Sequence, residues 1–400
     1  MRIVMNAVNT ASAGGWGVFR GLVPALSAVA TDDEITVLLP PGNSSLPMRD
    51  GARVVLVPQV RRGPRMQWRL VDDFFRLPAI ARRLQPDVFF SITDLAPSRV
   101  GCPHVLLLHN PWVTYRLSRR QIGPSLRDQL IYAAYYPARF RRLWPRLARV
   151  IVQTPVMGDR LRARFGVPAE RITVIPPGCL LNPGGTPLRR RRVTSAEPLR
   201  LFWPARAYPH KNHDVLAPLC RELMRRGLSD RVHFYLTVDT RSDRRGQRLL
   251  KGLRHCSSMV TNLGPLAKQQ VERWFDQTDA LFLPTLLESF SLTYLEAAAR
   301  RRPIVTSDRD FARHACGDAG YYVDPENPGD ICDRLRELIA HLNEGTVRIP
   351  DAPRDGQTGT SWNDVAARIL SVLHEAAGAG GRGTLDVETS PAVAAAGGSR

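Results

Sequence analysis

The sequence predicts an α/β protein built from two doubly wound parallel sheets that face each other across a cleft. Its 400 residues are more than one hydrophobic core usually serves, so we expect two domains. Short apolar runs alternate with amphipathic stretches along most of the chain, which is typical of parallel sheets covered by helices on both faces. A segment rich in Pro, Gly and Arg, residues 179–198, separates two series of such runs and is predicted to be a linker.

The first unit, residues 1–178, opens with the apolar run 1–8, which breaks into the glycine-rich stretch 11–17. A helical pattern of apolar residues follows from Phe19 to Leu26. A strand, a glycine loop and a helix in this order begin a doubly wound unit. Further strands are predicted by apolar runs at 34–40, 52–58, 87–92, 104–109, 149–154 and 172–178.

The second unit, residues 199–361, repeats this alternation. Strands are predicted at 199–205, 232–238, 259–263, 280–285, 303–308 and 320–325. Helices are predicted at 213–227, 268–277, 291–301 and 328–343, followed by a C-terminal helix at 362–377. The last stretch, 378–400, is rich in Gly and Ala and is expected to be disordered. In such folds ligands bind at the carboxyl ends of the strands, so we expect a site between the two sheets.

The composition excludes several classes of protein. Apolar residues at 44% and charged residues at 23% exclude a wholly disordered or fibrous chain. No uninterrupted apolar run reaches the ~18 residues that a membrane-spanning helix needs, and the N-terminus makes a poor signal peptide. Six cysteines without a C-x-x-C pair favour reduced, buried thiols over a disulfide framework or a zinc site. We therefore expect a cytoplasmic protein.

The net charge is strongly positive. Lys and Arg exceed Asp and Glu by 56 − 37 = +19, and residues 1–150 hold 21 basic and 9 acidic side chains. Such a field favours nucleic acid, an anionic membrane surface or phosphorylated ligands. The alternative is that part of this charge reflects only a preference for Arg over Lys in a GC-rich genome, without any partner.

The most informative segment is residues 279–308. An apolar strand ends at Pro284–Thr285, a polar loop carries Glu288, and a helix begins near Ser291, a suitable N-cap. The free amides at a helix start form an anion site. Glu288 and Glu296 flank this start, where carboxylates accept hydrogen bonds from sugar or ribose hydroxyls. A glutamate of the N-terminal turn and a solvated helix glutamate would show the same spacing.

The second segment is residues 201–216, where a strand ends near Ala205 and a loop carries Arg206 and Lys211. At the carboxyl end of a strand, two cations neutralise a diphosphate. In so basic a chain, two exposed basic side chains without a function are an equally simple interpretation.

Together the two segments resemble the retaining glycosyltransferases of family four, which have the GT-B fold of two facing Rossmann-like domains. The family pattern is an Arg and a Lys five residues apart, then Pro-Ser/Thr after a later strand, then two Glu eight residues apart. Here the matching residues are Arg206, Lys211, Pro284–Thr285, Glu288 and Glu296. The resemblance extends through 300–308, 317–325 and 361–370, and more loosely through 13–19, 108–112 and 174–178.

The resemblance implies four residues that act on the reacting groups. Arg206 and Lys211 would bind the donor diphosphate and stabilise the charge that grows on it, which is usually the largest catalytic contribution. Glu288 would bind hydroxyls of the donor sugar. His109, which the pattern alone would make an ordinary strand-end histidine, would contact the donor sugar near the reacting carbon.

The resemblance also implies residues that hold the donor. Glu296 would bind the ribose hydroxyls, and Gly14 and Gly15 would let the backbone approach the diphosphate. The remaining donor-binding residues would be Phe290, Ser291 and Leu292 through their backbone amides, and Leu263 and Gly264 in the loop that borders the base.

One departure from the family concerns two serines, Ser289 and Ser291, where many relatives have glycine. Serine keeps the backbone amide but narrows the anion site, so we expect a change in which sugar fits. No cofactor is expected and no metal site is required. Asp308-Arg309-Asp310 mimics a D-x-D metal ligand, but we interpret it as a coincidence of sequence.

Two Arg-rich segments with aromatic residues, 61–83 and 115–149, predict docking of the first domain on an anionic membrane. In the first, Arg62, Arg65, Arg69, Arg76 and Arg83 fall within an arc of about 60°. The second holds nine arginines against one acid, Asp128. A solvated basic face that packs only on its own domain is the alternative.

The resulting prediction is a metal-independent, retaining transferase that moves a hexose-type sugar, mannose as the first choice, from a nucleotide diphosphate sugar to an acceptor hydroxyl. The acceptor would be a glycan or a lipid-linked sugar of bacterial surface polysaccharide, lipopolysaccharide or glycolipid assembly. The main alternative is a non-catalytic, membrane-associated scaffold on the same fold. Nucleic-acid binding lacks a recognisable reading module. A phosphorylase would need a lysine for pyridoxal phosphate, and Lys251 and Lys268 have no supporting pattern.

Overall fold

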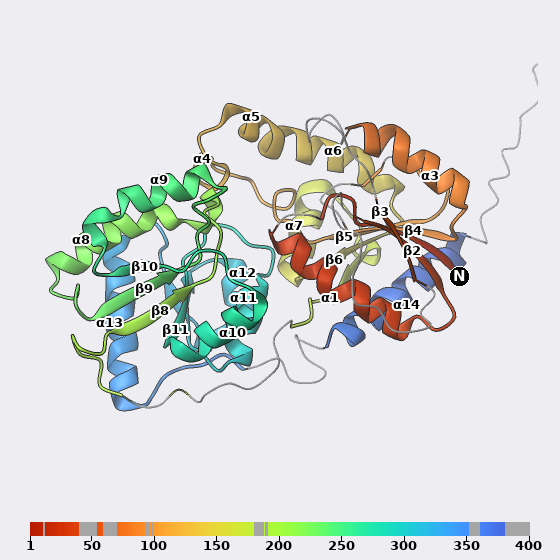
Figure 1. The fold of residues 1–400 in the computed structure, drawn as a ribbon. Helices are drawn as coiled ribbons and strands as arrows, with labels where there is room; N and C mark the ends of the chain where they lie inside the picture. The colour runs from red at the N-terminus through yellow and green to blue at the C-terminus, as the bar shows by residue number, and fades with distance from the viewer. Residues whose placement is uncertain are drawn as a thin grey trace, which may run out of the picture.

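The computed structural model describes residues 1–10, 13–39, 54–58, 70–92, 96–97, 99–179, 188, 191–351 and 361–380. Figure 1 shows two α/β domains side by side, each built around one parallel sheet. Within the described residues the first sheet has seven strands and the second has six. The predicted fold class is confirmed.

The first sheet has the strand order β3-β2-β1-β4-β5-β6-β7, and all its neighbouring pairs are parallel. Its strands are β1 (Arg2–Asn6), β2 (Glu34–Leu39), β3 (Val54–Pro58), β4 (Val88–Ser91), β5 (His104–Leu108), β6 (Arg149–Val152) and β7 (Ile172–Val174). The order reverses between β1 and β4, which is where doubly wound sheets bind ligands. Each strand lies within an apolar run that predicted it.

Helices cover both faces of this sheet. They are α1 (Ala13–Val29), η1 (Asp72–Arg76), α3 (Leu77–Leu84), α4 (Arg119–Ile122), α5 (Leu126–Gln129), η2 (Leu130–Tyr135), α6 (Tyr136–Leu143), η3 (Trp144–Arg146), α7 (Pro155–Phe165) and η4 (Ala169–Arg171). Side chains of β5 alternate between the two cores, so Val105 packs with the α1 side and Leu106 with the α6 and α7 side. Helices α5 and α6 join through the π-helical segment η2 without leaving helical backbone angles.

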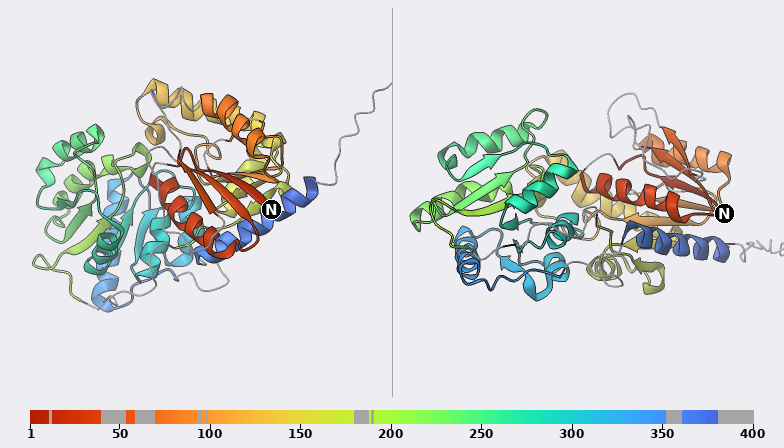
Figure 2. Two further views of the ribbon diagram at one scale, coloured as in Figure 1. Left: turned by 45° about the vertical axis from the view of Figure 1, so that its right-hand side comes forward. Right: turned by 60° about the horizontal axis from the view of Figure 1, so that its bottom comes forward.

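The C-terminal helix α14 (Trp362–Gly380) returns to the first domain and packs beside α1 (Figure 2). Val365, Ile369 and Leu373 are buried in the same core as the residues of α1. Trp362 lies so close to Gly21 that a Cβ atom there would stand 2.1 Å from its ring. The helix continues past the predicted end at residue 377, and residues 381–400 lie outside the described part.

The second sheet has the order β10-β9-β8-β11-β12-β13, again entirely parallel. Its strands are β8 (Leu199–Trp203), β9 (Val232–Leu236), β10 (Val260–Asn262), β11 (Ala280–Leu283), β12 (Ile304–Ser307) and β13 (Tyr321–Val323). Its helices are η5 (Pro209–Lys211), η6 (His213–Val215), α8 (Leu216–Arg225), α9 (Arg244–Gly252), η7 (Arg254–Cys256), α10 (Lys268–Gln277), α11 (Leu292–Ala299), α12 (Asp310–Cys316), η8 (Gly317–Ala319) and α13 (Pro328–Glu344). Helices α9 and α12 were not predicted, because the first is mostly polar and the second has only seven residues.

All six cysteines lie in the described residues as free thiols, four of them buried and two, Cys102 and Cys179, half-buried. None of the helices in the described part of the chain combines the length and the apolar character that crossing a bilayer requires.

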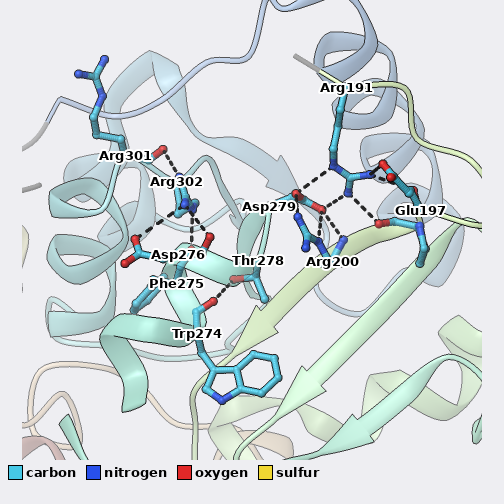
Figure 3. A network of polar contacts seen from close by, with 11 residues as sticks. Arg191, Glu197, Arg200, Trp274, Phe275, Asp276, Thr278, Asp279, Arg301 and Arg302 are labelled. Carbon is cyan, nitrogen blue, oxygen red and sulfur yellow. Dashed lines mark hydrogen bonds and ion pairs between the residues drawn. The ribbon is translucent and has the colours of Figure 1, made fainter. Parts of the chain in front are cut away.

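A buried carboxylate attaches the end of the predicted linker to the second domain. Figure 3 shows Asp279 between Arg191 and Arg200, with its side chain only 1% exposed. Arg200 donates to Asp279 from its backbone amide at 2.8 Å and from Nη2 at 3.0 Å, while Arg191 donates from Nε at 3.2 Å. The arginine run at the end of the linker therefore includes a side chain that the second domain binds tightly.

Asp279→Ala is expected to lower the free energy of unfolding by about 2–3 kcal/mol, because two guanidinium groups lose their shared buried partner. The effect stays below that of a fully buried pair, since Arg200 keeps contact with water. Urea unfolding followed by circular dichroism measures it. Asp32→Ala, which removes an exposed carboxylate, is the control; equal effects of the two substitutions would contradict the assignment.

Candidate active site

A cavity of about 1200 Å³ lies between the two domains, at the carboxyl edges of both sheets. The first domain contributes the segments after β1, β5 and β6, together with residues 122–132. The second domain contributes the segments after β8 and β11 and parts of α9 and α11. The site therefore lies where the fold of parallel sheets predicts it.

Hydrogen bonds hold the loop after β8 in one conformation. Asn212 adopts left-handed backbone angles, with φ at 62°, and donates from Nδ2 to the carbonyls of Pro284 at 2.9 Å and Pro325 at 2.7 Å. The carbonyl of His210 accepts from Leu286 N at 2.7 Å. These contacts tie the loop to the segments after β11 and β13, so that Lys211 lines the cavity together with Arg206, which is exposed.

The two histidines of this loop are neutral. Burial lowers the pKa of His213 to about 3, and its ring stacks on Trp203 with centroids 4.3 Å apart. Burial, and then the nearby Lys211, hold the pKa of His210 well below its ordinary value. The loop therefore carries its positive charge on Arg206 and Lys211.

Lys211 and Glu288 form an ion pair across the cavity wall, between Nζ and Oε1. Glu288 is only 8% exposed, so its carboxylate relies on this partner rather than on water. The sequence predicted both residues for the site but not their contact. An anionic ligand that binds the Lys211 ammonium group would free the Glu288 carboxylate to accept hydrogen bonds from hydroxyl groups. Binding of the anion and binding of the hydroxyl groups would then be coupled.

Helix α11 begins at Leu292, directly after Ser291, as predicted, but the serine does not cap it with a side-chain hydrogen bond. Ser291 has φ at 69°, in the left-handed region that favours glycine. The neighbouring Ser289 donates from Oγ to Oε1 of Gln153, in the first domain, at 3.2 Å. Phe290, Ser291 and Leu292 line the cavity, so the helix start borders it.

Glu296 lies on α11 and also lines the cavity. Burial raises the pKa of its carboxyl group to about 7; Lys268 partly offsets this effect and Glu272 adds to it. The group therefore exchanges a proton near neutral pH.

The first-domain wall contains His109, directly after β5, and Gly15 on α1. A Cβ atom at position 15 would lie 2.9 Å from Nε2 of His109, so only glycine leaves room for this imidazole. Gly14 stands in the first turn of α1, and its surroundings lie outside the described residues.

Leu263 and Gly264 belong to the loop that was predicted to border the base. Leu263 and Gly264 follow the edge strand β10, where Leu263 N donates to Leu236 O at 2.8 Å, and neither is among the described residues that line the cavity. Strand β9 separates β10 from β8, so the end of β10 is displaced from the centre of the site. That this loop borders the base stays a prediction.

The two carboxylates of Asp308-Arg309-Asp310 bind arginines. Asp308 accepts from Arg313 at 2.6 and 2.9 Å. Asp310 accepts from Tyr115 Oη at 2.9 Å and from Arg160 Nε at 3.1 Å, both in the first domain. The motif therefore helps to hold the two domains together.

Family comparisons agree with this geometry. The profile described as Glycosyltransferase Family 4 matches residues 18–181, and the profile described as Glycosyl transferases group 1 matches residues 198–341. The chain belongs to the family 4 glycosyltransferases.

The chain is also similar to curated glycosyltransferases in sequence and to solved structures in fold. The D-inositol 3-phosphate glycosyltransferase of Paenarthrobacter aurescens is 27% identical over 244 residues, which are 57% of this chain and 58% of that protein. The chain thus spans little more than half the length of the curated relatives it matches. Anabaena HepE in complex with UDP and glucose has a TM-score of 0.63 at 15% identity, over 94% of this chain and all of the other. WaaG, a glycosyltransferase involved in lipopolysaccharide biosynthesis, has a TM-score of 0.60 at 14% identity, over 95% of this chain and all of the other. These structures share the GT-B fold with this family 4 chain.

The structure adds cavity residues that the sequence did not single out as site residues. Arg245 and Arg248 of α9 line the second-domain half, and Trp112, Asp128 and Tyr132 line the first-domain half. The three-residue spacing of the two arginines was visible, but α9 itself was not predicted. Asp128 was noticeable only as the single acid among nine arginines.

The raised pKa of Glu296 predicts that this group destabilises the fold as pH rises. The folded chain holds the proton up to about pH 7, whereas an unfolded glutamate releases it near pH 4.5. The contribution of this group to the free energy of unfolding therefore decreases as the pH rises from 4.5 to 7. Glu296→Gln removes this dependence. Relative to the parent, the variant should therefore gain thermal stability between pH 5 and pH 8.

Thermal unfolding at several pH values measures this difference. Glu344→Gln, on the exposed end of α13, controls for the loss of a carboxylate. Parallel stability profiles of Glu296→Gln and the parent would contradict the expected proton exchange.

Proposed function

We propose that this chain is a retaining, nucleotide-sugar-dependent glycosyltransferase. The observation that carries the proposal is the convergence of Arg206, Lys211, Glu288 and Glu296, with the start of α11, on one cavity between two α/β domains. Cations on one wall suit a diphosphate, and carboxylates beside them suit hydroxyl groups.

In this proposal Arg206 and Lys211 hold the donor diphosphate, and Arg245 and Arg248 add positive charge to the same wall. Preorganised cations stabilise the negative charge that develops as the bond to the anomeric carbon breaks. Since the diphosphate competes with Glu288 for the Lys211 ammonium group, donor binding frees that carboxylate for sugar hydroxyls. Glu296 binds the ribose, and the first-turn amides of α11 bind phosphate or sugar.

The chemical step exchanges one bond for another at the anomeric carbon. The bond to the phosphate oxygen breaks, and the acceptor oxygen forms a bond on the same face of the sugar, with retention. The acceptor proton passes to the departing phosphate. His109, held against Gly15, contacts the donor sugar beside the reacting carbon. In this scheme the charge on the phosphate is balanced by side chains, with no cofactor and no metal required.

The donor is proposed to carry a hexose, with mannose and glucose the first to test, and UDP, GDP and ADP as candidate nucleotides. UDP is included because HepE was solved with it. The acceptor is a glycan or lipid-linked sugar of bacterial surface polysaccharide or lipopolysaccharide assembly, a setting shared with WaaG. D-inositol 3-phosphate, which the names of the curated relatives specify, is the other acceptor to test. A non-catalytic scaffold would bind membranes without consuming any donor.

The first domain also carries a surface suited to docking from the cytoplasm on an anionic membrane. Helices α3, α5 and α6 follow one another along one side of it (Figure 1), and Arg139 stacks on Phe74 at 4.9 Å. Phe75, Leu126 and Leu130 are 71%, 71% and 68% exposed there. Helices α3, α4, α5 and α6 also carry exposed arginines: Arg82, Arg83, Arg119, Arg120, Arg127, Arg141 and Arg142.

This surface differs in detail from the prediction. Of the aromatic residues in 115–149, Tyr115, Tyr136 and Phe140 are buried, so aliphatic side chains and Phe75 take the outward positions. Residues 61–69, with three of the five arginines of the predicted arc, lie outside the described residues.

Lys211→Ala should lower kcat by about 10²–10³-fold while the fold is kept, because the charge on the leaving phosphate loses one of the cations that stabilise it. The donor is first identified by thermal shift with nucleotide diphosphates and their sugars, since ligands that bind only the folded chain stabilise it. Release of the nucleoside diphosphate then measures turnover. Lys251→Ala, an exposed lysine on α9, is the control. Near-normal turnover by Lys211→Ala would show that the phosphate role is wrong.

Membrane docking predicts that the chain floats with anionic vesicles of phosphatidylglycerol and that salt weakens this binding. Phe75→Gln combined with Leu126→Gln should reduce flotation several-fold. Met224→Gln, an apolar residue 41% exposed on the second domain, is the control and should have no effect. Equal binding to neutral vesicles, or no binding, would count against the proposal.

A further inference from the structure

Two stacked aromatic rings form part of the first-domain wall of the cavity. The rings of Trp112 and Tyr132 have centroids 4.6 Å apart and an interplanar angle of 28°. His210 packs edge-on against Trp112 at 5.1 Å and 87°, which fixes the indole between the two domains. Both Trp112 and Tyr132 are half-buried and line the cavity. They add aromatic surface to this wall.

A carboxylate lies on the same wall. Asp128 is half-buried in α5, whose start is capped by Ser125, with Asp128 N donating to Ser125 Oγ at 3.3 Å. Among the described residues, no hydrogen bond or ion pair reaches the Asp128 carboxylate, although nine arginines lie in residues 115–149. By contrast, Glu288 is paired with Lys211, and Asp214 is paired with Arg245.

The cavity therefore has two electrostatically different halves. The cationic side chains among its described lining residues, Arg206, Lys211, Arg245 and Arg248, all belong to the second domain. The first-domain half presents aromatic rings, neutral polar groups and the carboxylate of Asp128. Binding of an anionic group is therefore favoured in the second-domain half and disfavoured beside Asp128 in the first-domain half.

We infer that Trp112, Tyr132 and Asp128 form the acceptor subsite and that it takes an uncharged sugar ring. This inference rests on the proposed function and adds the chemical class of the acceptor. The carbon-bound hydrogens of a sugar ring pack on the aromatic pair, while its hydroxyls donate to Asp128, a pure acceptor when ionised. Hydrogen bonds to a charged oxygen are stronger than neutral ones, so Asp128 orients the ring. A phosphorylated polyol would place its anion beside this carboxylate, at a cost from like charges.

The test measures transfer by the full chain from the nucleotide sugar that stabilises it most. Acceptors are methyl α-D-mannoside and methyl α-D-glucoside, compared with inositol phosphate. We expect the parent to use a hexoside. Asp128→Asn should raise the KM for this acceptor about tenfold or more, because a charge-assisted hydrogen bond is lost. Tyr132→Leu should raise the same KM. The KM for the donor and the rate of slow donor hydrolysis without acceptor should change less than about twofold. A general structural defect would change these two quantities as well. Asp32→Asn, an exposed carboxylate, is the matched control.

Three outcomes would overturn the inference. The first is a parent that uses inositol phosphate and no hexoside, with Asp128→Asn improving that reaction. The second is an unchanged acceptor KM in both variants. The third is a parent that neither binds nor hydrolyses any nucleotide sugar; this result alone removes the proposed function as well, so the two failures are distinguishable.

Discussion

The site depends on the side-chain amide of Asn212, which joins three loops from separate strands of the second sheet. Its two hydrogen bonds reach the segments after β11 and β13 from the segment after β8. The left-handed backbone at this residue turns the chain from η5 into η6, a conformation that asparagine tolerates better than most residues. Since Lys211 directly precedes it, these bonds help to place the ammonium group beside Glu288. The charge pattern of the cavity is thus a consequence of neutral hydrogen bonds to backbone carbonyls.

Strands were the most predictable part of this molecule, and placement of distant elements was the least. Buried parallel strands need continuous apolar runs, and each such run could be read directly from the sequence. The periodicity of 362–376 predicts a helix, but its docking beside α1 depends on the fit of Trp362 to Gly21, 341 positions earlier. Likewise the resemblance identified Lys211 and Glu288 as site residues but not their ion pair. The two residues are 77 positions apart, so no local sequence pattern indicates the contact. The position of β10 at the sheet edge, which places Leu263, is likewise set by strand pairing, which no local signal reports.

The two serines that depart from the family pattern have different physical consequences. Ser291 holds a backbone angle suited to glycine, at a cost of about 1–2 kcal/mol. Ser289 instead gains a contact, because its hydroxyl reaches Gln153 across the domain boundary. A glycine at 289 would remove this link, whereas a glycine at 291 would relieve strain. The conformation of the loop before α11 therefore depends on contacts with its surroundings, such as Gln153, as well as on its own sequence.

Helix α5 and segment η2 bring the two surfaces of the first domain together. Leu126 and Leu130 are largely exposed, while Asp128 and Tyr132, each two residues further along, line the cavity. Two residues correspond to about 200° of rotation in a helix, so the pairs face opposite sides. A helix lying on a membrane by its outer face would thus hold the inner face ready for a sugar. If the proposed docking and the proposed subsite both hold, the sugar of a lipid-linked acceptor would reach the subsite without leaving the membrane surface, and the two proposals would describe one arrangement.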